Sequence, residues 1–156
     1  ILNLFALRFK RASEVMLPFN KVVTVRSSMG KEEILKTIIA SGHTRLPVIS
    51  DEPEPQIAGI LHTKEFVAMM DTKTEFSLTS LLRKPYFVDV NESILRILKS
   101  FQENRIHMAV VHQATRSIGI ITLEDIVEEV VGEIYDEDDD GMVKKMWNQQ
   151  IGMRRY

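Results

Sequence analysis

A threonine and an aspartate three residues apart form a pair whose types and spacing suit two kinds of chemistry. Thr122 and Asp125 lie in GIITLEDIVEEVVGEI (119–134), where a short aliphatic run gives way to an acidic, helix-like segment. One interpretation is a capping box, in which each side chain accepts a backbone N–H at a helix start and contributes about 1 kcal/mol. The other is ligand binding, because a carboxylate at a strand-to-helix turn can accept both hydroxyls of a ribose. The pattern leaves both interpretations open.

The segments around this pair occur twice along the chain, in the same order. Each copy begins with a run rich in β-branched or aromatic residues, which indicates a strand. A helix-like stretch with apolar residues every three to four positions follows, and then two aliphatic segments. The second aliphatic segment carries a shared pattern of Gly, two aliphatic residues, a polar residue and, three positions on, a carboxylate. The paired segments are KVVTV (21–25) and YFVDV (86–90), KEEILKTIIASG (31–42) and NESILRILKSFQEN (91–104), TRLPVI (44–49) and IHMAVV (106–111), and GILHTKEF (59–66) and GIITLEDI (119–126).

The repeat predicts an α/β fold built from two β-α-β-β-α units. One unit is too small to bury enough apolar surface alone, so we expect the two to pack about a pseudo-twofold axis. The segment between them is polar at first and becomes a short helix that ends before Pro85. The expected boundaries are a helical linker at 1–14, the first unit at 15–70, the connecting segment at 71–84, the second unit at 85–134 and an acidic, then basic, tail at 135–156.

Composition excludes several functional classes. Hydrophobic residues make up 44% of the 156 positions and charged residues 27%, as in an ordinary globular protein. There is no cysteine, which rules out disulfides, thiol nucleophiles and cysteine zinc sites. The net charge of −2 gives no electrostatic basis for nucleic-acid binding. No apolar run approaches the roughly 20 residues that span a bilayer, and since the chain opens on Ile1 we expect it to be part of a longer protein.

Other motifs fall short of a site. The acidic run DEDDDG (136–141) begins like a calcium loop, but its twelfth position is Trp147 rather than Glu. A solvated acidic tail is the favoured interpretation, with a cation-sensing patch shared with Glu128, Glu129 and Glu133 as the alternative. The histidines show no metal-binding spacing, and the sequence has no nucleotide-hydrolysing or hydride-transfer motif. We therefore expect neither a metal site nor a catalytic residue.

A resemblance to a known family rests on SGHTRLPVI (41–49) with IAGILHTKEFV (57–67), followed by RIHMAVV (105–111) and GIITLEDIVEEVVGEIYDE (119–137). Together these segments resemble a tandem pair of CBS domains, a Bateman module. Within that family the chain is most similar to the CorC/HlyC hemolysin-related group and to the cyclin-M magnesium transporters. The resemblance runs from about Ala12 to Asp140, most of the chain. It implies a regulatory adenine-nucleotide sensor rather than an enzyme.

The resemblance implies one nucleotide site. In the first unit, His62 and Glu65 replace the Thr and Asp of the second, so we expect the second pair alone to hold a ribose. Arginine suits phosphate because its guanidinium is always charged and rich in donors, and Mg²⁺ could bridge the phosphates while keeping most of its waters. The implied ligand is ATP or another adenine nucleotide. The implied nucleotide-binding residues are Val22, Val23 and Ile120 beside the adenine, Thr44 and Arg45 facing the phosphates, His43 near the nucleotide, and Thr122 and Asp125 on the ribose.

The resemblance also implies partners and a location. The parent would be a membrane-associated magnesium and cobalt efflux protein, with this module on the cytoplasmic side of the bacterial inner membrane. Two copies would form a homodimer shaped as a flat disc, and the segments flanking the repeat would relay a nucleotide-driven population shift to the transport domain. The alternative is a nucleotide-free dimerisation scaffold. A nucleotide hydrolase is a distant third, because His43, His107 and Glu124 lack the groups that would support a catalytic base.

Overall fold

The structure, a computed structural model, describes residues 4–137, with side chains through residue 132. It contains two four-stranded sheets. The first has the order β2 (Val25–Arg26), β3 (Arg45–Ile49), β4 (Ile57–His62), β5 (Leu82–Arg83). The second has the order β1 (Leu17–Pro18), β8 (Arg116–Thr122), β7 (Met108–Gln113), β6 (Phe87–Asp89). The helices are α1 (Ala12–Val15), α2 (Lys31–Ser41), α3 (Thr63–Met70), α4 (Leu78–Leu81), α5 (Ile94–Asn104) and α6 (Leu123–Glu137), with 3₁₀ helices η1 (Leu4–Arg8) and η2 (Phe19–Lys21).

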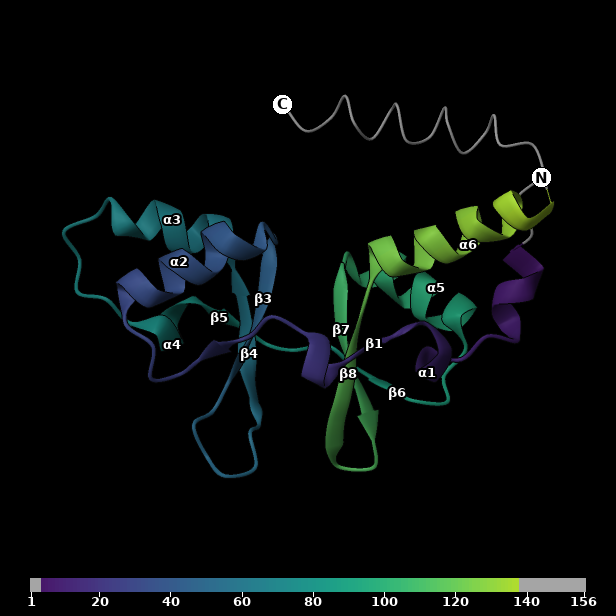
Figure 1. Cartoon of the computed structure of the whole chain (residues 1–156), viewed down its shortest axis with the longest axis horizontal. Coiled ribbons are helices and arrows are strands. Elements are labelled where there is room, and N and C mark those ends of the chain that lie inside the picture. The colour runs from purple at the N-terminus through teal and green to yellow at the C-terminus, as the bar shows by residue number, and fades with distance from the viewer. Residues whose placement is uncertain (1–3, 138–156) are drawn as a thin grey trace.

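The predicted repeat is present in both sheets. The first motif runs β2-α2-β3-β4-α3 and the second β6-α5-β7-β8-α6, which confirms the predicted α/β fold of two β-α-β-β-α units. Each motif pairs its first strand in parallel with the next and forms an antiparallel hairpin. The two hairpins share a register shift, between Val48 and Ile49 and between Val111 and His112. In Figure 1 the two sheets stand next to each other, with the long helices on one side and the two hairpins projecting on the other.

Each motif has its own hydrophobic core, and the helical spacing seen in the sequence supplies much of it. In α5, Ile94, Ile97 and Phe101 face inward and are almost completely buried. Ser93 caps this helix, since its hydroxyl accepts the backbone N–H of Arg96 at 3.3 Å. Full burial of such a side chain stabilises the fold by about 1.5–3 kcal/mol. The first core is built from Val25, Ile34, Ile38, Leu46, Val48, Leu61, Phe66 and Leu78.

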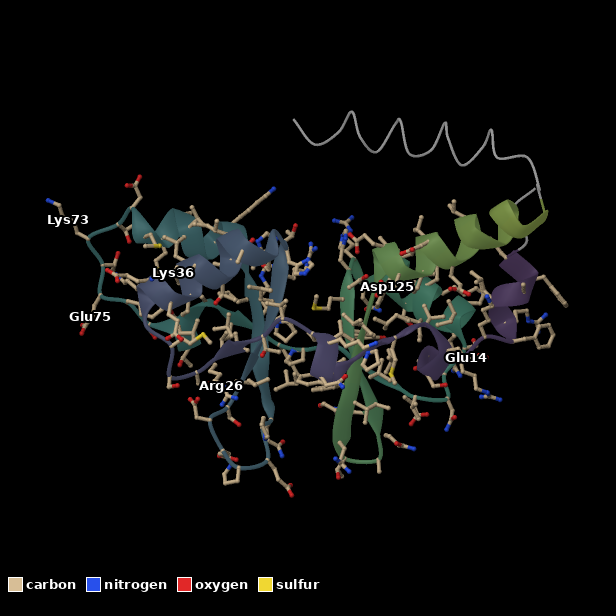
Figure 2. The ribbon with its side chains drawn as sticks, viewed as in Figure 1. Glu14, Arg26, Lys36, Lys73, Glu75 and Asp125 are labelled. Atoms are coloured by element: carbon tan, nitrogen blue, oxygen red, sulfur yellow. The ribbon has the colours of Figure 1, made fainter. Side chains whose placement is uncertain are left out.

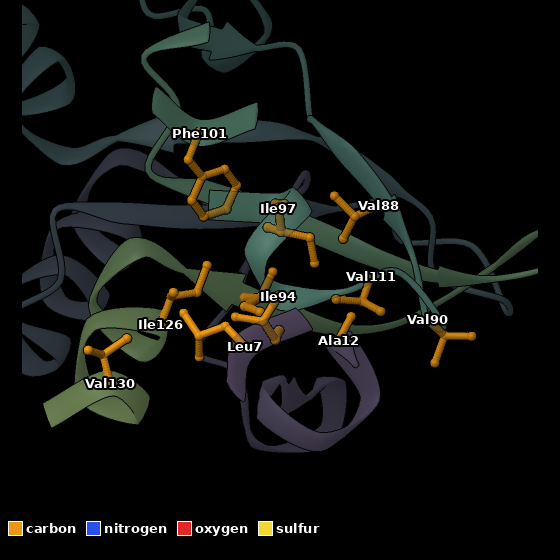
Figure 3. Packing of buried hydrophobic residues seen from close by; sticks show 12 residues of the cluster. Leu7, Ala12, Val88, Val90, Ile94, Ile97, Phe101, Val111, Ile126 and Val130 are labelled. Atoms are coloured by element: carbon orange, nitrogen blue, oxygen red, sulfur yellow. The ribbon is translucent and has the colours of Figure 1, made fainter. Parts of the chain in front are cut away.

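Residues 4–18 belong to the second motif although they precede the first. Leu7 and Ala12 are fully buried among its core residues (Figure 3). The Ala12 N–H donates to the carbonyl of Glu92 at 2.9 Å, which ties the segment to the turn before α5. The chain then enters β1, which pairs with β8 at the edge of the second sheet. The described part of the expected helical linker is therefore packed against the second motif, before the chain crosses to the first.

The glycine of the repeated sequence pattern lies where an edge strand crosses each hairpin. A Cβ at Gly119 would lie 2.7 Å from both the Leu17 carbonyl oxygen and the Met16 sulfur. A Cβ at Gly59 would lie 2.8 Å from the Cβ of Leu82, in the edge strand β5. Because contacts this short force something to move, each glycine allows an edge strand from outside the motif to complete the sheet.

The last described helix takes in the start of the expected tail. α6 continues to Glu137, so the acidic run begins inside the helix, at Asp136. The rest of that run and the basic end, residues 138–156, lie outside the described residues. None of the helices within residues 4–137 is long and apolar enough to cross a membrane.

Candidate functional site

A cleft of about 390 Å³ opens between the two motifs; we call it the first cleft. The turn after α2 and strand β3 line it from the first motif, and the end of β8 with the first turn of α6 lines it from the second. The segment that crosses from β1 to β2 supplies a further wall. All eight residues predicted from the sequence line this cleft: Val22, Val23, His43, Thr44, Arg45, Ile120, Thr122 and Asp125. Their role as nucleotide ligands stays a prediction.

Four polar or sulfur-bearing lining residues were not among the predicted nucleotide ligands, namely Lys21, His107, Met108 and Glu124. The repeat contains the signal that could have found two of them. In the structure His107 and Met108 hold the places of Thr44 and Arg45, because Met108 pairs with Thr122 as Arg45 pairs with His62. The sequence alignment of TRLPVI with IHMAVV is therefore shifted by one residue. Both members of each of these two pairs line the first cleft.

The structure forms the capping box at the start of α6. The Thr122 N–H donates to Oδ2 of Asp125 at 2.9 Å, and the Asp125 N–H donates to the Thr122 hydroxyl oxygen at 3.2 Å. The local interpretation of Thr-x-x-Asp is thus correct, and both side chains are half-buried. Figure 2 shows Asp125 below the start of α6, near the region where the sheets meet.

The box does not exhaust the hydrogen-bonding capacity of the two side chains. Asp125 uses one carboxylate oxygen, and no other described residue bonds to its Oδ1. The Thr122 hydroxyl accepts a bond but donates none to the described residues. A free carboxylate oxygen and a hydroxyl proton therefore remain, fixed in orientation by the cap. The two interpretations of the pair are compatible because the cap positions the groups that a ligand would need.

The corresponding position in the first motif is built differently. His62 precedes α3 without a side-chain cap, and its buried Nδ1 has no partner among the described residues. Burial, followed by the charges of Arg45 and Arg83, holds the pKa of His62 below its ordinary value. Glu65 is paired with Arg83, and this hydrogen bond lowers the pKa of the Glu65 carboxyl. The carboxylate equivalent to Asp125 is therefore already engaged.

The two valines predicted to lie in the first strand do not lie in a strand. The structure places Val22 at the end of η2, in an extended conformation, and Val23 in the unpaired segment that follows, with β2 beginning only at Val25. This part of the chain is crossing from the second sheet to the first, so it has no neighbouring strand to pair with. Val23 remains 39% exposed, whereas Ile120 on β8 is 3% exposed. The cleft thus has aliphatic surface on two sides.

Acidic side chains do not gather into a metal centre within the described residues. Of the residues in the cation-sensing alternative, Glu129 forms an ion pair with Lys10, which joins α6 to the N-terminal segment. The side chain of Glu133 and the residues after Glu137 lie outside the description.

Two α/β motifs packed about a pseudo-twofold axis, with a polar and aliphatic cleft between them, define a paired α/β module. A comparison with family models agrees, since the CBS domain matches residues 12–71 and 78–132. The chain belongs to the CBS-domain family and contains a pair of CBS motifs.

Relatives named CorC and hemolysin C match most of the chain. The magnesium and cobalt efflux protein CorC of Pasteurella multocida is 39% identical over 132 residues, which cover 83% of this chain and 44% of that protein. Hemolysin C of Brachyspira hyodysenteriae is 33% identical over 141 residues, covering 90% of this chain and 52% of that protein. The chain spans about half the length of these relatives.

Solved structures show the same fold. The CBS domain of a bacterial CNNM/CorC family Mg²⁺ transporter in complex with ATP is 27% identical, with a TM-score of 0.72 over 83% of this chain and 92% of that one. A CBS-domain pair with bound AMP from Klebsiella pneumoniae is 25% identical, with a TM-score of 0.68 over 78% of this chain and 98% of that one.

Proposed function

We propose that this chain is the adenine-nucleotide-binding regulatory module of a CorC-type magnesium and cobalt efflux protein, with ATP as its ligand in the first cleft. The observation that carries the proposal is the capping box, which holds an unused carboxylate oxygen of Asp125 and the Thr122 hydroxyl in the cleft. The ATP and AMP complexes of similar CBS domains, and the CorC relatives, support it.

Each part of the lining matches one part of the nucleotide. Asp125 would accept the ribose hydroxyls, and the aliphatic walls would contact the flat purine, as the apolar surface of Ile120 suits. Arg45 and Lys21 are fixed cations for the phosphates, and Arg45 offers several donors in a fixed geometry. Mg²⁺ would need few protein ligands, because it binds the phosphates and keeps its waters.

The proposed mechanism is a population shift. The cleft is lined by both motifs and by the crossing segment, so a nucleotide favours the arrangement in which all three are correctly placed. A ligand shifts such an equilibrium only by its difference in affinity for the two states, and about 1–3 kcal/mol suffices for regulation. The N-terminal segment and α6 would carry the change to the transport part of the parent, since Lys10 and Glu129 link them. The parent would hold this module at the cytoplasmic side of the bacterial inner membrane.

A nucleotide-free dimerisation scaffold is the second candidate. Apolar side chains on three helices face solvent, with Ile39 72%, Val67 49% and Val127 45% exposed. Exposed apolar surface of this kind suits a homodimer interface. If this is the whole function, the Thr122–Asp125 pair is only a helix cap. Dimerisation is also compatible with nucleotide binding. Only a measurement of nucleotide binding therefore distinguishes the two candidate functions.

Titration calorimetry of the chain with ATP, ADP and AMP, with and without Mg²⁺, tests the proposal. The informative variant is Asp125→Asn, because an amide oxygen can still accept the Thr122 N–H but the second carboxylate oxygen is lost. We expect one nucleotide per chain, affinity at least about tenfold weaker in Asp125→Asn, and an unchanged melting temperature without ligand. Arg45→Ala should remove the preference for additional phosphates.

An absence of nucleotide binding would contradict the proposal. No heat with any nucleotide, and no thermal shift at millimolar concentration, would leave the box as a cap and the module as a scaffold. A true ligand at one hundred times its Kd should stabilise the chain by about 2.7 kcal/mol, which a melting experiment readily detects.

A further inference from the structure

A second cleft, of about 410 Å³, lies on the other side of the pseudo-twofold axis. It shares three lining residues with the first cleft, namely Arg45, His107 and Met108. The other lining residues come from the end of the connecting segment, the turn after α5, and β4. The chemistry of this cleft is not that of the first.

The second cleft differs from the first at the residues that correspond to the crossing valines and to the ribose carboxylate. Val25 pairs with Val48, and Val88 pairs with Val111 at the matching point of the second hairpin. The counterparts of the crossing valines are therefore Pro85 and Tyr86. The counterpart of the ribose carboxylate is Glu65, which Arg83 engages. A ribose would therefore find no free carboxylate at the position that Asp125 occupies in the first motif.

The second cleft is rich in positively charged side chains. Arg45, Arg83, Lys84 and Arg105 line the second cleft together with His107, and its lining contains no carboxylate. Among the described residues, Arg83 is the one member of this set with an ion-pair partner. Several positive charges around one small concavity repel one another, and a multivalent anion would relieve that repulsion.

Arg105 occupies a backbone position that favours glycine. It ends α5 with φ of 53°, in the left-handed region. The equivalent position at the end of α2 is Gly42, with φ of 65°. A side chain in this conformation carries a steric cost that glycine avoids. Arg105 therefore adopts a strained backbone conformation at the end of α5, where its side chain lines the second cleft, whereas glycine occupies the matching position at the end of α2.

We propose that the second cleft binds a small multivalent phosphate anion without a base, held by Lys84, Arg105 and the cations they share the cleft with. The proposal does not depend on nucleotide binding in the first cleft, because Lys84 and Arg105 do not line that cleft. The phosphate tail of ATP is a second source of the same chemistry, and the experiment separates the two sources.

The test is calorimetric titration of the chain with inorganic pyrophosphate, in Mg²⁺-free buffer at constant ionic strength. We expect one pyrophosphate per chain and a dissociation constant that rises with salt. Lys84→Ala and Arg105→Gly should each weaken binding about tenfold. The matched controls are Lys21→Ala, in the first cleft only, and Arg96→Ala, whose side chain is 79% exposed on α5; both should bind pyrophosphate as the parent does.

Arg105→Gly separates function from folding, because glycine suits the left-handed position. Its melting temperature should equal or exceed that of the parent while anion affinity falls. Three results overturn the proposal: no pyrophosphate binding at millimolar concentration, parental affinity in both Lys84→Ala and Arg105→Gly, or an equal loss in Lys21→Ala. If Lys84→Ala weakens ATP binding as strongly as pyrophosphate binding, the cleft holds the nucleotide's own phosphates and the free-anion assignment fails.

Discussion

Replacing Gly119 with alanine should disturb the fold and the first cleft together. The new Cβ would lie 2.7 Å from the Leu17 carbonyl oxygen, which is backbone and cannot rotate away, and 2.7 Å from the Met16 sulfur. The edge strand β1 must therefore move off β8, where Leu17 now pairs with Ile120. Overpacking of this kind costs about 1–3 kcal/mol, which for a chain of this size lowers the melting temperature by roughly 2–12 °C.

Gly132→Ala is the matched control because nothing lies within 4 Å of a Cβ at that position. Gly132 is inside α6, where alanine is the better helix former by about 0.5–1 kcal/mol, so this variant should melt higher than the parent. Circular dichroism melting of both variants is the assay. Since Leu17 lines the first cleft, Gly119→Ala should also weaken ATP binding. A Gly119→Ala variant as stable as the parent would refute the close-approach argument.

Two further predictions concern the N-terminal segment and the histidine of the first motif. Leu7→Ala should destabilise the chain by about 2–5 kcal/mol in urea unfolding, because Leu7 is fully buried in the second core, whereas Leu4→Ala, 44% exposed, should cost far less. Because the folded-state pKa of His62 lies below the ordinary value of 6.5, the folded state binds fewer protons than the unfolded chain in this range. Its contribution to stability should thus be present above pH 6.5 and be lost as pH falls through the folded pKa. Unfolding free energies measured from pH 8 to 5 should show this decline, and His62→Asn should reduce it; an unchanged decline would assign it to other groups.

The internal repeat made most of the fold predictable. Apolar spacing in KEEILKTIIASG and NESILRILKSFQEN marked α2 and α5 to within a few residues, because a core-facing helix must repeat its apolar side chains every three to four positions. The shared glycine pattern located both hairpins. The same alignment, with the family resemblance, gathered eight residues that the structure does place around one cleft.

The parts that could not be predicted are those set by partners distant in sequence. A strand of two residues such as Leu17–Pro18 has no periodicity, and only its pairing with β8 makes it a strand. The burial of Leu7 likewise depends on a core assembled about ninety residues later. The run KVVTV has the composition of a strand, yet Val22 and Val23 bridge two sheets and pair with neither. Composition indicates which secondary structure a segment can adopt, and its tertiary contacts decide which one it adopts.

The two clefts share lining side chains, so a ligand in one cleft would affect binding in the other. Arg45 at the start of β3 and His107 just before β7 line both, so each of these side chains is shared by two cavities. An anion in the second cleft would draw the Arg45 guanidinium away from the first, and ATP phosphates would draw it back. Linkage requires that the two effects be equal: the factor by which pyrophosphate weakens ATP is the factor by which ATP weakens pyrophosphate. A pseudo-symmetric module with one nucleoside-type cleft and one cationic cleft can therefore compare two ligands through a single shared arginine.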